Sequence, residues 1–317
     1  MAPGSELPAI RYLLLAIIYT FARARLICQA HPLSCNLGRP QLGWHPPATQ
    51  GAPVTTLYES ETVHLSVIIP AYNERERLVP YMTEITGYLG RRGKPYEVLV
   101  VDDGSHDGTA ALVEQFRTKE PAVRLLRLAQ NTGKGCAVRT GMQVARGEFQ
   151  LMADADGATP IQELERLEAA IGTGADIAIG SRFLASRDRR YTVKARWHRS
   201  VLGNTFNWIV QRLGIPGISD TQCGFKLFRK TVARDLFGAA LVAGYGFDLE
   251  LLYVAQRRGY RIAEVPVNWA DQPGSKVRVL QDGLRMLLDL FAVRRNYANG
   301  RYEPSSTEAV THVPRLT

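Results

Sequence analysis

Short apolar runs alternate with longer segments of helical periodicity through the middle of the chain. Runs of strand length occupy residues 65–69, 96–101, 123–128, 149–153 and 176–179. Apolar residues between them recur every three or four positions, and this spacing predicts helices over 74–90, 110–116 and 137–145. Strands rich in Val and Ile that alternate with helices predict an α/β domain. We expect a mostly parallel sheet with helices on both faces.

The pattern changes after residue 182. Residues 187–199 contain six Lys or Arg, and a helical apolar pattern follows over 201–213. Such a basic loop is either a solvated face beside a core helix or a site for an anionic, apolar substrate. Residues 261–268 read as a last strand. The amphipathic, basic segment 279–293 predicts a C-terminal helix that docks on the domain or lies on a membrane surface.

The two ends of the chain differ from this middle part. Residues 1–63 hold one apolar segment, 12–22, flanked by Arg11 and Arg23 and followed by a linker rich in Pro and Gly. At about 1.5 Å per residue, the segment covers only about half of a bilayer core. A secretory signal, an interfacial helix and a dispensable start are all compatible with it, and we favour a weak membrane anchor or leader. The predicted domain spans 64–298, and 299–317 reads as a disordered tail.

Composition narrows the class of partner. A chain of 317 residues suffices for one large α/β domain or two small ones. Its net charge of +9 favours acidic partners, namely phosphates, nucleotides, nucleic acid or an anionic membrane. The four Cys include no C-x-x-C pair, which argues against a disulfide or zinc framework and for reduced cytoplasmic thiols.

Acidic residues follow several of the predicted strands. Asp154 and Asp156 come directly after the run 149–153, and Glu74, Asp102 and Asp103 follow two other strands. The carboxyl ends of parallel strands share one edge of a sheet, where ligands bind. Two close carboxylates repel each other unless a cation neutralises them, and Mg²⁺ or Mn²⁺ is the natural choice. The alternative is a loop with two solvated aspartates, one of which caps the next helix.

Two common phosphate-binding motifs are missing. No G-x-G-x-x-G follows the first strand, which disfavours a dinucleotide-binding domain. Gly133-Lys134-Gly135 lacks the following Ser or Thr and the upstream Gly of a P-loop. A nucleoside diphosphate held by strand-end carboxylates and one metal ion remains.

Five motifs in this order resemble the inverting family 2 glycosyltransferases, which have the nucleotide-binding, Rossmann-like GT-A fold. They are Val67-Ile-Ile-Pro-Ala-Tyr-Asn-Glu74, Val101-Asp-Asp-Gly-Ser105, Asn131-Thr-Gly-Lys-Gly135, Asp154-Ala-Asp156 and Gly180-Ser-Arg182. Within that family, segments 220–228, 247–252 and 267–276 are most similar to the dolichyl-phosphate β-glucosyltransferases. This resemblance implies UDP-glucose as the donor and a dolichyl or other polyprenyl phosphate as the acceptor.

The resemblance also implies roles for individual residues. The nucleoside pocket would include Pro70, Tyr72, Glu74, Asp102 and Asp103, and Lys134 would help to hold the nucleotide. Asp154 and Asp156 would bind the metal ion. The diphosphate and the acceptor phosphate would lie among Arg182, Arg196, Ser200 and Lys276. Structural alternatives stay open: Tyr72 can be a packing residue, Asp102 a helix cap and Lys134 a surface charge.

The acceptor decides whether a catalytic base is needed. An acceptor phosphate is already anionic near neutral pH, so it needs positioning rather than deprotonation. A sugar hydroxyl would need a carboxylate base, for which Asp248 and Glu250 are the candidates. Their structural alternatives are a helix cap and a surface charge.

Other functions are weighed against the same residues. A transferase of mannose or another hexose stays open, because motifs do not show donor contacts. A polysaccharide synthase would carry membrane-spanning helices and a Gln-x-x-Arg-Trp stretch, and this chain has neither. A nucleotide- or nucleic-acid-binding module could use residues 187–199, but aromatic residues are sparse there and strand-end acids would repel a nucleic acid. We expect a peripheral enzyme on the cytoplasmic face of a membrane.

Overall fold

The computed structural model describes residues 62–194, 206–274 and 279–303. These residues belong to one compact unit that spans Tyr58–Thr317. The predictions for residues 1–61 and 304–317, and those for Arg196, Ser200 and Lys276, lie outside the described residues.

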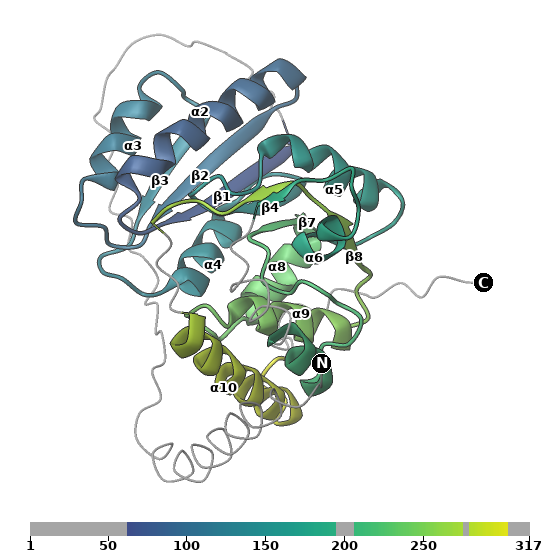
Figure 1. The fold of residues 1–317 in the computed structure, drawn as a ribbon. Helices are drawn as coiled ribbons and strands as arrows, with labels where there is room; N and C mark the ends of the chain where they lie inside the picture. Colours follow the sequence, from purple (N-terminus) through teal and green to yellow (C-terminus); the bar gives the residue numbers. More distant parts are fainter. Residues whose placement is uncertain (1–61, 195–205, 275–278, 304–317) are drawn as a thin grey trace, which may run out of the picture. The chain divides into compact units, whose positions relative to one another are not determined.

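A seven-stranded sheet forms the centre of this unit, in the order β3-β2-β1-β4-β7-β5-β8 (Figure 1). The strands are β1 (Leu65–Ala71), β2 (Tyr96–Asp102), β3 (Val123–Arg127), β4 (Phe149–Ala153), β5 (Ile177–Ser181), β7 (Phe225–Arg229) and β8 (Ile262–Pro266). Only β7 runs antiparallel to its neighbours, β4 and β5. The predicted mostly parallel sheet is therefore confirmed.

Strand β7 is missing from the sequence prediction. A lysine interrupts its apolar residues, as in Phe225-Lys226-Leu227, which is not the pattern of a strand buried on both faces. Lys226 is nevertheless fully buried. Because Lys226 interrupts the apolar pattern, this interior strand is not recognised from the sequence.

Helices cover both faces of the sheet, as predicted (Figure 1). One face is covered by α2 (Arg75–Arg92), α3 (Thr109–Arg117), the 3-10 turn η1 (Ile161–Glu163) and α5 (Leu164–Gly172). The other face is covered by α4 (Lys134–Val144), α8 (Lys230–Ala239), α9 (Phe247–Arg257) and α10 (Val279–Ala298). The short helix α6 (Arg182–Ser186) follows β5, and β6 (Val193–Lys194) pairs with β9 (Trp269–Ala270) in a small second sheet.

Consecutive strand residues pack into two separate hydrophobic cores, one on each face of the sheet. In β1, Val67 and Ile69 pack on the side of α2, whereas Ile68 packs on the side of α4. All three are fully buried. Burial on both faces explains why the strands read as near-continuous apolar runs.

Two predicted helices end later than expected. Helix α2 continues through Gly90 to Arg92 and is capped by Gly93, which has a φ of 65°. A residue without a Cβ accepts this left-handed conformation at a helix end, so Gly93, not Gly90, is the stop signal. Helix α10 continues to Ala298.

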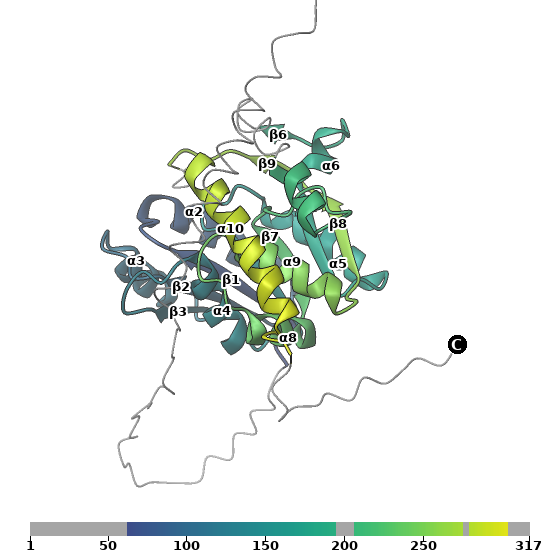
Figure 2. The ribbon, with the colours of Figure 1, turned by 90° about the horizontal axis from the view of Figure 1, so that it is seen from below.

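Helix α10 docks on the domain, which was one of its two predicted roles. Its buried side chains Met286, Leu287, Leu290 and Val293 join the same core as α9. The two helices lie side by side (Figure 2). Tyr302, within the predicted tail, is also buried. The packed part of the chain thus extends beyond α10.

Candidate active site at the carboxyl edge of the sheet

The turns after β1 and β2 are joined to each other. The Asn73 amide nitrogen donates to Ser105 Oγ over 2.8 Å, and Asn73 Oδ1 accepts from the His106 amide over 2.9 Å. Asn73 adopts a φ of 52°, which Asn tolerates better than most residues. Pro70 lies in β1 and Tyr72 in the turn itself. The predicted nucleoside-pocket residues Pro70 and Tyr72 therefore lie at one end of the sheet, in β1 and in the turn after it.

Asp102 and Asp103 are adjacent, but their carboxylates have different surroundings. Asp103 accepts three hydrogen bonds of 2.7–2.9 Å from Thr132 and Gly133, and so anchors the loop before α4. Asp102 Oδ1 accepts from the Ser105 amide over 3.2 Å. Its Oδ2 is buried and lies 3.8 Å from Arg127 Nε, and it accepts no hydrogen bond from the described part of the chain. Asp102 therefore keeps the capacity to accept a hydrogen bond from a ligand, and Asp103 acts as an anchor.

Gly133 and Gly135, on either side of Lys134, allow the loop at residues 241–243 to approach the start of α4. A Cβ on Gly133 would lie 2.5 Å from the Ala243 carbonyl oxygen, and one on Gly135 would lie 2.6 Å from that of Val242. The Cys136 amide donates to the same Ala243 oxygen over 3.1 Å. These glycines thus serve helix–loop packing, and they place Lys134 at the first turn of α4.

Lys134 is not the surface charge that one reading of the sequence allowed. Its Nζ lies 2.6 Å from Asp154 Oδ1, so the lysine reaches the candidate metal ligand directly. Burial alone would lower the pKa of Lys134, but Asp154 and Asp248 outweigh this effect and raise the pKa above its ordinary value. The lysine therefore stays charged inside the site.

The two candidate metal ligands lie just beyond β4. The Asp154 amide donates to the Gly224 carbonyl oxygen over 3.1 Å, and Asp156 Oδ1 accepts from the Ala158 amide over 3.1 Å. Burial, and then the negative charge of Asp154, raise the pKa of Asp156. A cation between the carboxylates would remove this penalty.

The donor set fits Mg²⁺ or Mn²⁺. Within residues 62–194, 206–274 and 279–303, no cluster of three or more His, Cys, Asp or Glu could hold a metal ion. Mg²⁺ commonly takes one or two carboxylates and completes its shell with water and substrate phosphates. The hard oxygen donors Asp154 and Asp156 suit this arrangement.

Arg77 belongs to the site although the sequence analysis does not single it out. Its Nε and Nη2 donate to the two carboxylate oxygens of Glu74 over 2.8 and 2.7 Å, and its Nη1 lies 3.7 Å from Asp156 Oδ2. The spacing of Glu74 and Arg77 could have indicated this pair, because residues three positions apart meet on one face of a helix. Arg77 thus links the nucleoside-pocket acid to the metal-site acid.

Asp248, one of the two candidate bases, has a buried basic partner. Lys226 Nζ donates to Asp248 Oδ1 over 2.6 Å and to the Cys223 carbonyl oxygen over 2.7 Å. Burial raises the pKa of Asp248, against the opposing charges of Lys226 and Lys134. Lys226 was not singled out from the sequence, because its partner lies 22 positions away.

Glu250, the other candidate base, holds a loop. Its carboxylate accepts from the amides of Leu241 and Val242 over 2.8 and 2.9 Å and from Tyr302 Oη over 2.5 Å. This loop is the one that packs against Gly133 and Gly135. Glu250 is buried, so the interpretation as a surface charge is wrong, and its bonds give it an anchoring role.

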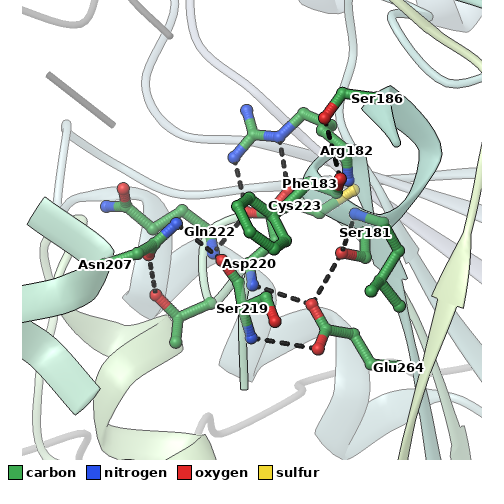
Figure 3. A network of polar contacts seen from close by, with 12 residues as sticks. Ser181, Arg182, Phe183, Ser186, Asn207, Ser219, Asp220, Gln222, Cys223 and Glu264 are labelled. Atoms are coloured by element: carbon green, nitrogen blue, oxygen red, sulfur yellow. Dashed lines mark hydrogen bonds and ion pairs between the residues drawn. The ribbon is translucent and has the colours of Figure 1, made fainter. Parts of the chain in front are cut away.

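The carboxylate of Asp220, which is not among the predicted site residues, clamps Arg182 (Figure 3). Its Nε and Nη2 donate to Asp220 Oδ2 and Oδ1, each over 2.7 Å, and its backbone amide donates to Oδ2 over 2.9 Å. Burial opposes the charge on Arg182, but the ion pair outweighs it and raises the pKa of Arg182. The same pair lowers the pKa of Asp220 although burial acts in the opposite direction. Both groups therefore stay ionised.

The described segments bear on the membrane and thiol predictions. In that part of the chain, no helix is both long and apolar enough to cross a bilayer. Cys136 and Cys223 are buried free thiols.

The chain is similar to known proteins over most of its length. Residues 66–237 match the family model described as "Glycosyl transferase family 2". The chain is 39% identical over 265 residues to a dolichyl-phosphate beta-glucosyltransferase of Homo sapiens, covering 80% of this chain and 81% of the relative. It is 39% identical over 258 residues to one of Dictyostelium discoideum, covering 78% of each chain, and 36% identical over 261 residues to one of Saccharomyces cerevisiae, covering 77% and 78%.

Solved structures share the fold at low sequence identity. Mannosyl-3-phosphoglycerate synthase from Rubrobacter xylanophilus superposes with a TM-score of 0.57 at 18% identity, covering 80% of this chain and 79% of that one. Glucosyl-3-phosphoglycerate synthase from Mycobacterium tuberculosis, in complex with Mn²⁺, UDP and glucosyl-3-phosphoglycerate, gives 0.54 at 19% identity, covering 78% and 86%. The predicted GT-A, Rossmann-like fold class is confirmed.

Proposed function

Because the chain belongs to glycosyl transferase family 2, we propose that this glycosyltransferase moves glucose from UDP-glucose to dolichyl phosphate or another polyprenyl phosphate. The products are UDP and a polyprenyl phosphate β-glucose. The curated relatives named above support the choice of sugar and acceptor. The observation that carries the proposal within the structure is the contact of Lys134 with Asp154, beside Asp156, at the carboxyl edge of the sheet.

The donor would lie across the ends of β1, β2 and β4. Pro70, Tyr72 and Glu74 would line the nucleoside pocket. Asp102 Oδ2, which lies 3.8 Å from Arg127 Nε, would accept a hydrogen bond from the base or the ribose. Asp154 and Asp156 would hold Mg²⁺ or Mn²⁺. When bound, the metal ion stabilises the negative charge of the departing diphosphate. Lys134 supplies a second positive charge on the same side.

The acceptor phosphate would attack without a catalytic base. One of its oxygens forms a bond to the anomeric carbon while the bond from that carbon to the diphosphate breaks, so that UDP leaves with the electron pair and the configuration inverts. The nucleophile is already anionic, and it needs relief from repulsion by the diphosphate. Arg182 is suited to this, and Arg196, Ser200 and Lys276 stay proposed for the acceptor side. Asp248 and Glu250 are engaged with Lys226 and with the loop at Leu241.

A lipid acceptor implies work at a membrane surface. We propose peripheral attachment on the cytoplasmic face, where the net charge of +9 favours anionic lipids. Helix α10 uses its buried apolar face on the domain, so any membrane contact of α10 involves its other side, which includes the exposed Phe291.

A donor panel tests the proposal. The protein would be incubated with a short polyprenyl phosphate, Mg²⁺ or Mn²⁺, and UDP-glucose, GDP-mannose or UDP-N-acetylglucosamine in turn. We expect glucosyl transfer from UDP-glucose, dependent on the cation and absent from Asp156→Ala. Transfer from GDP-mannose in preference would overturn the donor assignment. Oligonucleotide binding without sugar transfer would instead favour a nucleic-acid-binding module.

A further inference from the structure

Arg182 presents a fixed edge of its guanidinium group. Two of its side-chain nitrogens and its backbone amide are used by Asp220, and the guanidinium carbon lies 5.4 Å from the ring centroid of Trp269. A guanidinium is planar, so a bidentate carboxylate fixes its orientation as well as its position. The remaining nitrogen, Nη1, donates to no group in the part of the chain that the structure describes.

Asp220 is itself held by a second acid. Glu264 Oε1 accepts from the Asp220 amide over 2.8 Å and from Ser181 Oγ over 2.6 Å, and Oε2 accepts from the Ser219 amide over 3.0 Å (Figure 3). Ser181 directly precedes Arg182 in the chain. Glu264 therefore holds both sides of the Arg182–Asp220 clamp, through the Ser181 hydroxyl next to Arg182 and through the backbone amide of Asp220.

The clamp and the candidate metal site share one short segment. Residues 220–224 begin with the carboxylate that binds Arg182 and end with Gly224, whose carbonyl oxygen accepts from the Asp154 amide over 3.1 Å. A shift of this segment would move Arg182 and the wall beside Asp154 together. Because Asp220 is almost fully buried and its carboxylate accepts only from Arg182 and Gln222 within the described residues, it has no exposed edge for substrate.

We propose that Asp220 and Glu264 are positioning residues, which aim the Nη1 edge of Arg182 at a phosphate group beside Asp154. This inference rests on the proposed function, because it requires a phosphate-bearing substrate at that place. It assigns the phosphate contact to Arg182 and the orientation of that contact to two acids that never touch the substrate.

A double-mutant cycle separates this role from simple stabilisation of the fold. The enzyme would be assayed with UDP-glucose and a short polyprenyl phosphate as wild type, Arg182→Ala, Asp220→Asn and the double variant. We expect each single change to lower kcat by about 100-fold, the usual loss when a preorganised charge contact is removed. The double variant should fall no further than Arg182→Ala, because Asp220 acts only through Arg182.

Glu264→Gln provides the second, milder variant in case Asp220→Asn fails to fold. We expect it to lower kcat by about tenfold in the wild type and to have no effect in the Arg182→Ala background. The control is Asp235→Asn, which breaks another carboxylate–arginine contact, 2.6 Å long, between Arg258 and a more exposed aspartate. That control should lower the melting temperature and leave kcat and its coupling to Arg182 unchanged.

The outcomes separate a failure of the positioning role from a failure of the proposed function. Effects of Asp220 and Arg182 that multiply would overturn the positioning role while wild-type transfer still supports the proposed function. Wild-type protein that transfers no sugar would overturn the proposed function itself. Equal kcat losses in Asp235→Asn would show that Asp220 and Glu264 are needed only for stability.

Discussion

Gly224 leaves no room for a side chain beside Asp154. A Cβ on Gly224 would lie only 1.9 Å from Asp154 Oδ2, so the carboxylate occupies the space that any other residue would fill. The antiparallel strand β7 begins directly after this glycine. The position of the Asp154 carboxylate therefore depends on a residue that lies 70 positions away in the sequence.

Gly224→Ala should damage catalysis more than folding. The added methyl group must displace the Asp154 carboxylate, and a displacement of about 1 Å at a reacting centre costs about 100-fold in rate. The measurement is kcat/KM for sugar transfer. Gly238→Ala serves as the control, since its added Cβ meets nothing within 4 Å inside α8 and should slightly stabilise the helix. Unimpaired transfer by Gly224→Ala would show that Asp154 does not need its present position.

Asp156→Asn should stabilise the protein while it abolishes transfer. Burial and Asp154 raise the pKa of Asp156, so stability is lost as the pH rises from the ordinary carboxyl pKa to the raised value, and the loss is complete above it. The stability gain should be largest near neutral pH. It should disappear at a pH below the ordinary carboxyl pKa of about 4, where Asp156 is protonated in the folded and unfolded states alike.

Urea unfolding of wild type and variant across this pH range, without added metal, measures the effect. A variant that is less stable at neutral pH would contradict the argument that the two carboxylates repel each other. Retention of transfer by Asp156→Asn would contradict its role as a metal ligand.

Lys226→Met should be strongly destabilising. The change leaves the Asp248 carboxylate buried without its partner at 2.6 Å, and breaking a buried pair from one side typically costs about 3–5 kcal/mol. The double variant Lys226→Met, Asp248→Asn should recover part of this loss, because no buried charge is left unpaired. Chemical denaturation gives both values. Equal stability of the single and double variants would mean that the two side chains do not depend on each other.

Lys134→Met should weaken donor binding. The ammonium group lies 2.6 Å from Asp154 and is available to a diphosphate bound at the same place. Loss of one charged contact of about 1.5–3 kcal/mol corresponds to roughly 10- to 100-fold in the dissociation constant for UDP with Mn²⁺. Titration calorimetry measures this directly. Arg117→Met, which removes an exposed ion pair with Glu114, is a control that should leave UDP binding unchanged.

The sequence was most informative where single segments carry the signal. An apolar run that ends in Asp154 and Asp156 predicts both the buried strand and the acids at its tip, and the structure places them there. The same holds for Asp102 at the end of β2. These features depend on neighbours in the chain, so periodicity and strand ends suffice to find them.

Pairings between distant segments could not be read in this way. Arg182 and Asp220 lie 38 positions apart, and they meet only because β7 inserts between β4 and β5. Sequence patterns do not distinguish Asp103, which anchors a loop, from Asp102, whose Oδ2 accepts no hydrogen bond from the described residues. Which carboxylate is already engaged is a property of the folded chain.

The bond from Tyr302 to Glu250 sets a practical boundary for the catalytic unit. A shortened protein that stops at the end of α10 would lose the Tyr302 hydroxyl and, with it, one partner of the acid that holds Leu241 and Val242 against the start of α4. Truncations intended for crystallisation or assay should therefore retain residues through 303. A protein cut at 298 should bind its donor less tightly even though every residue of the donor pocket is present.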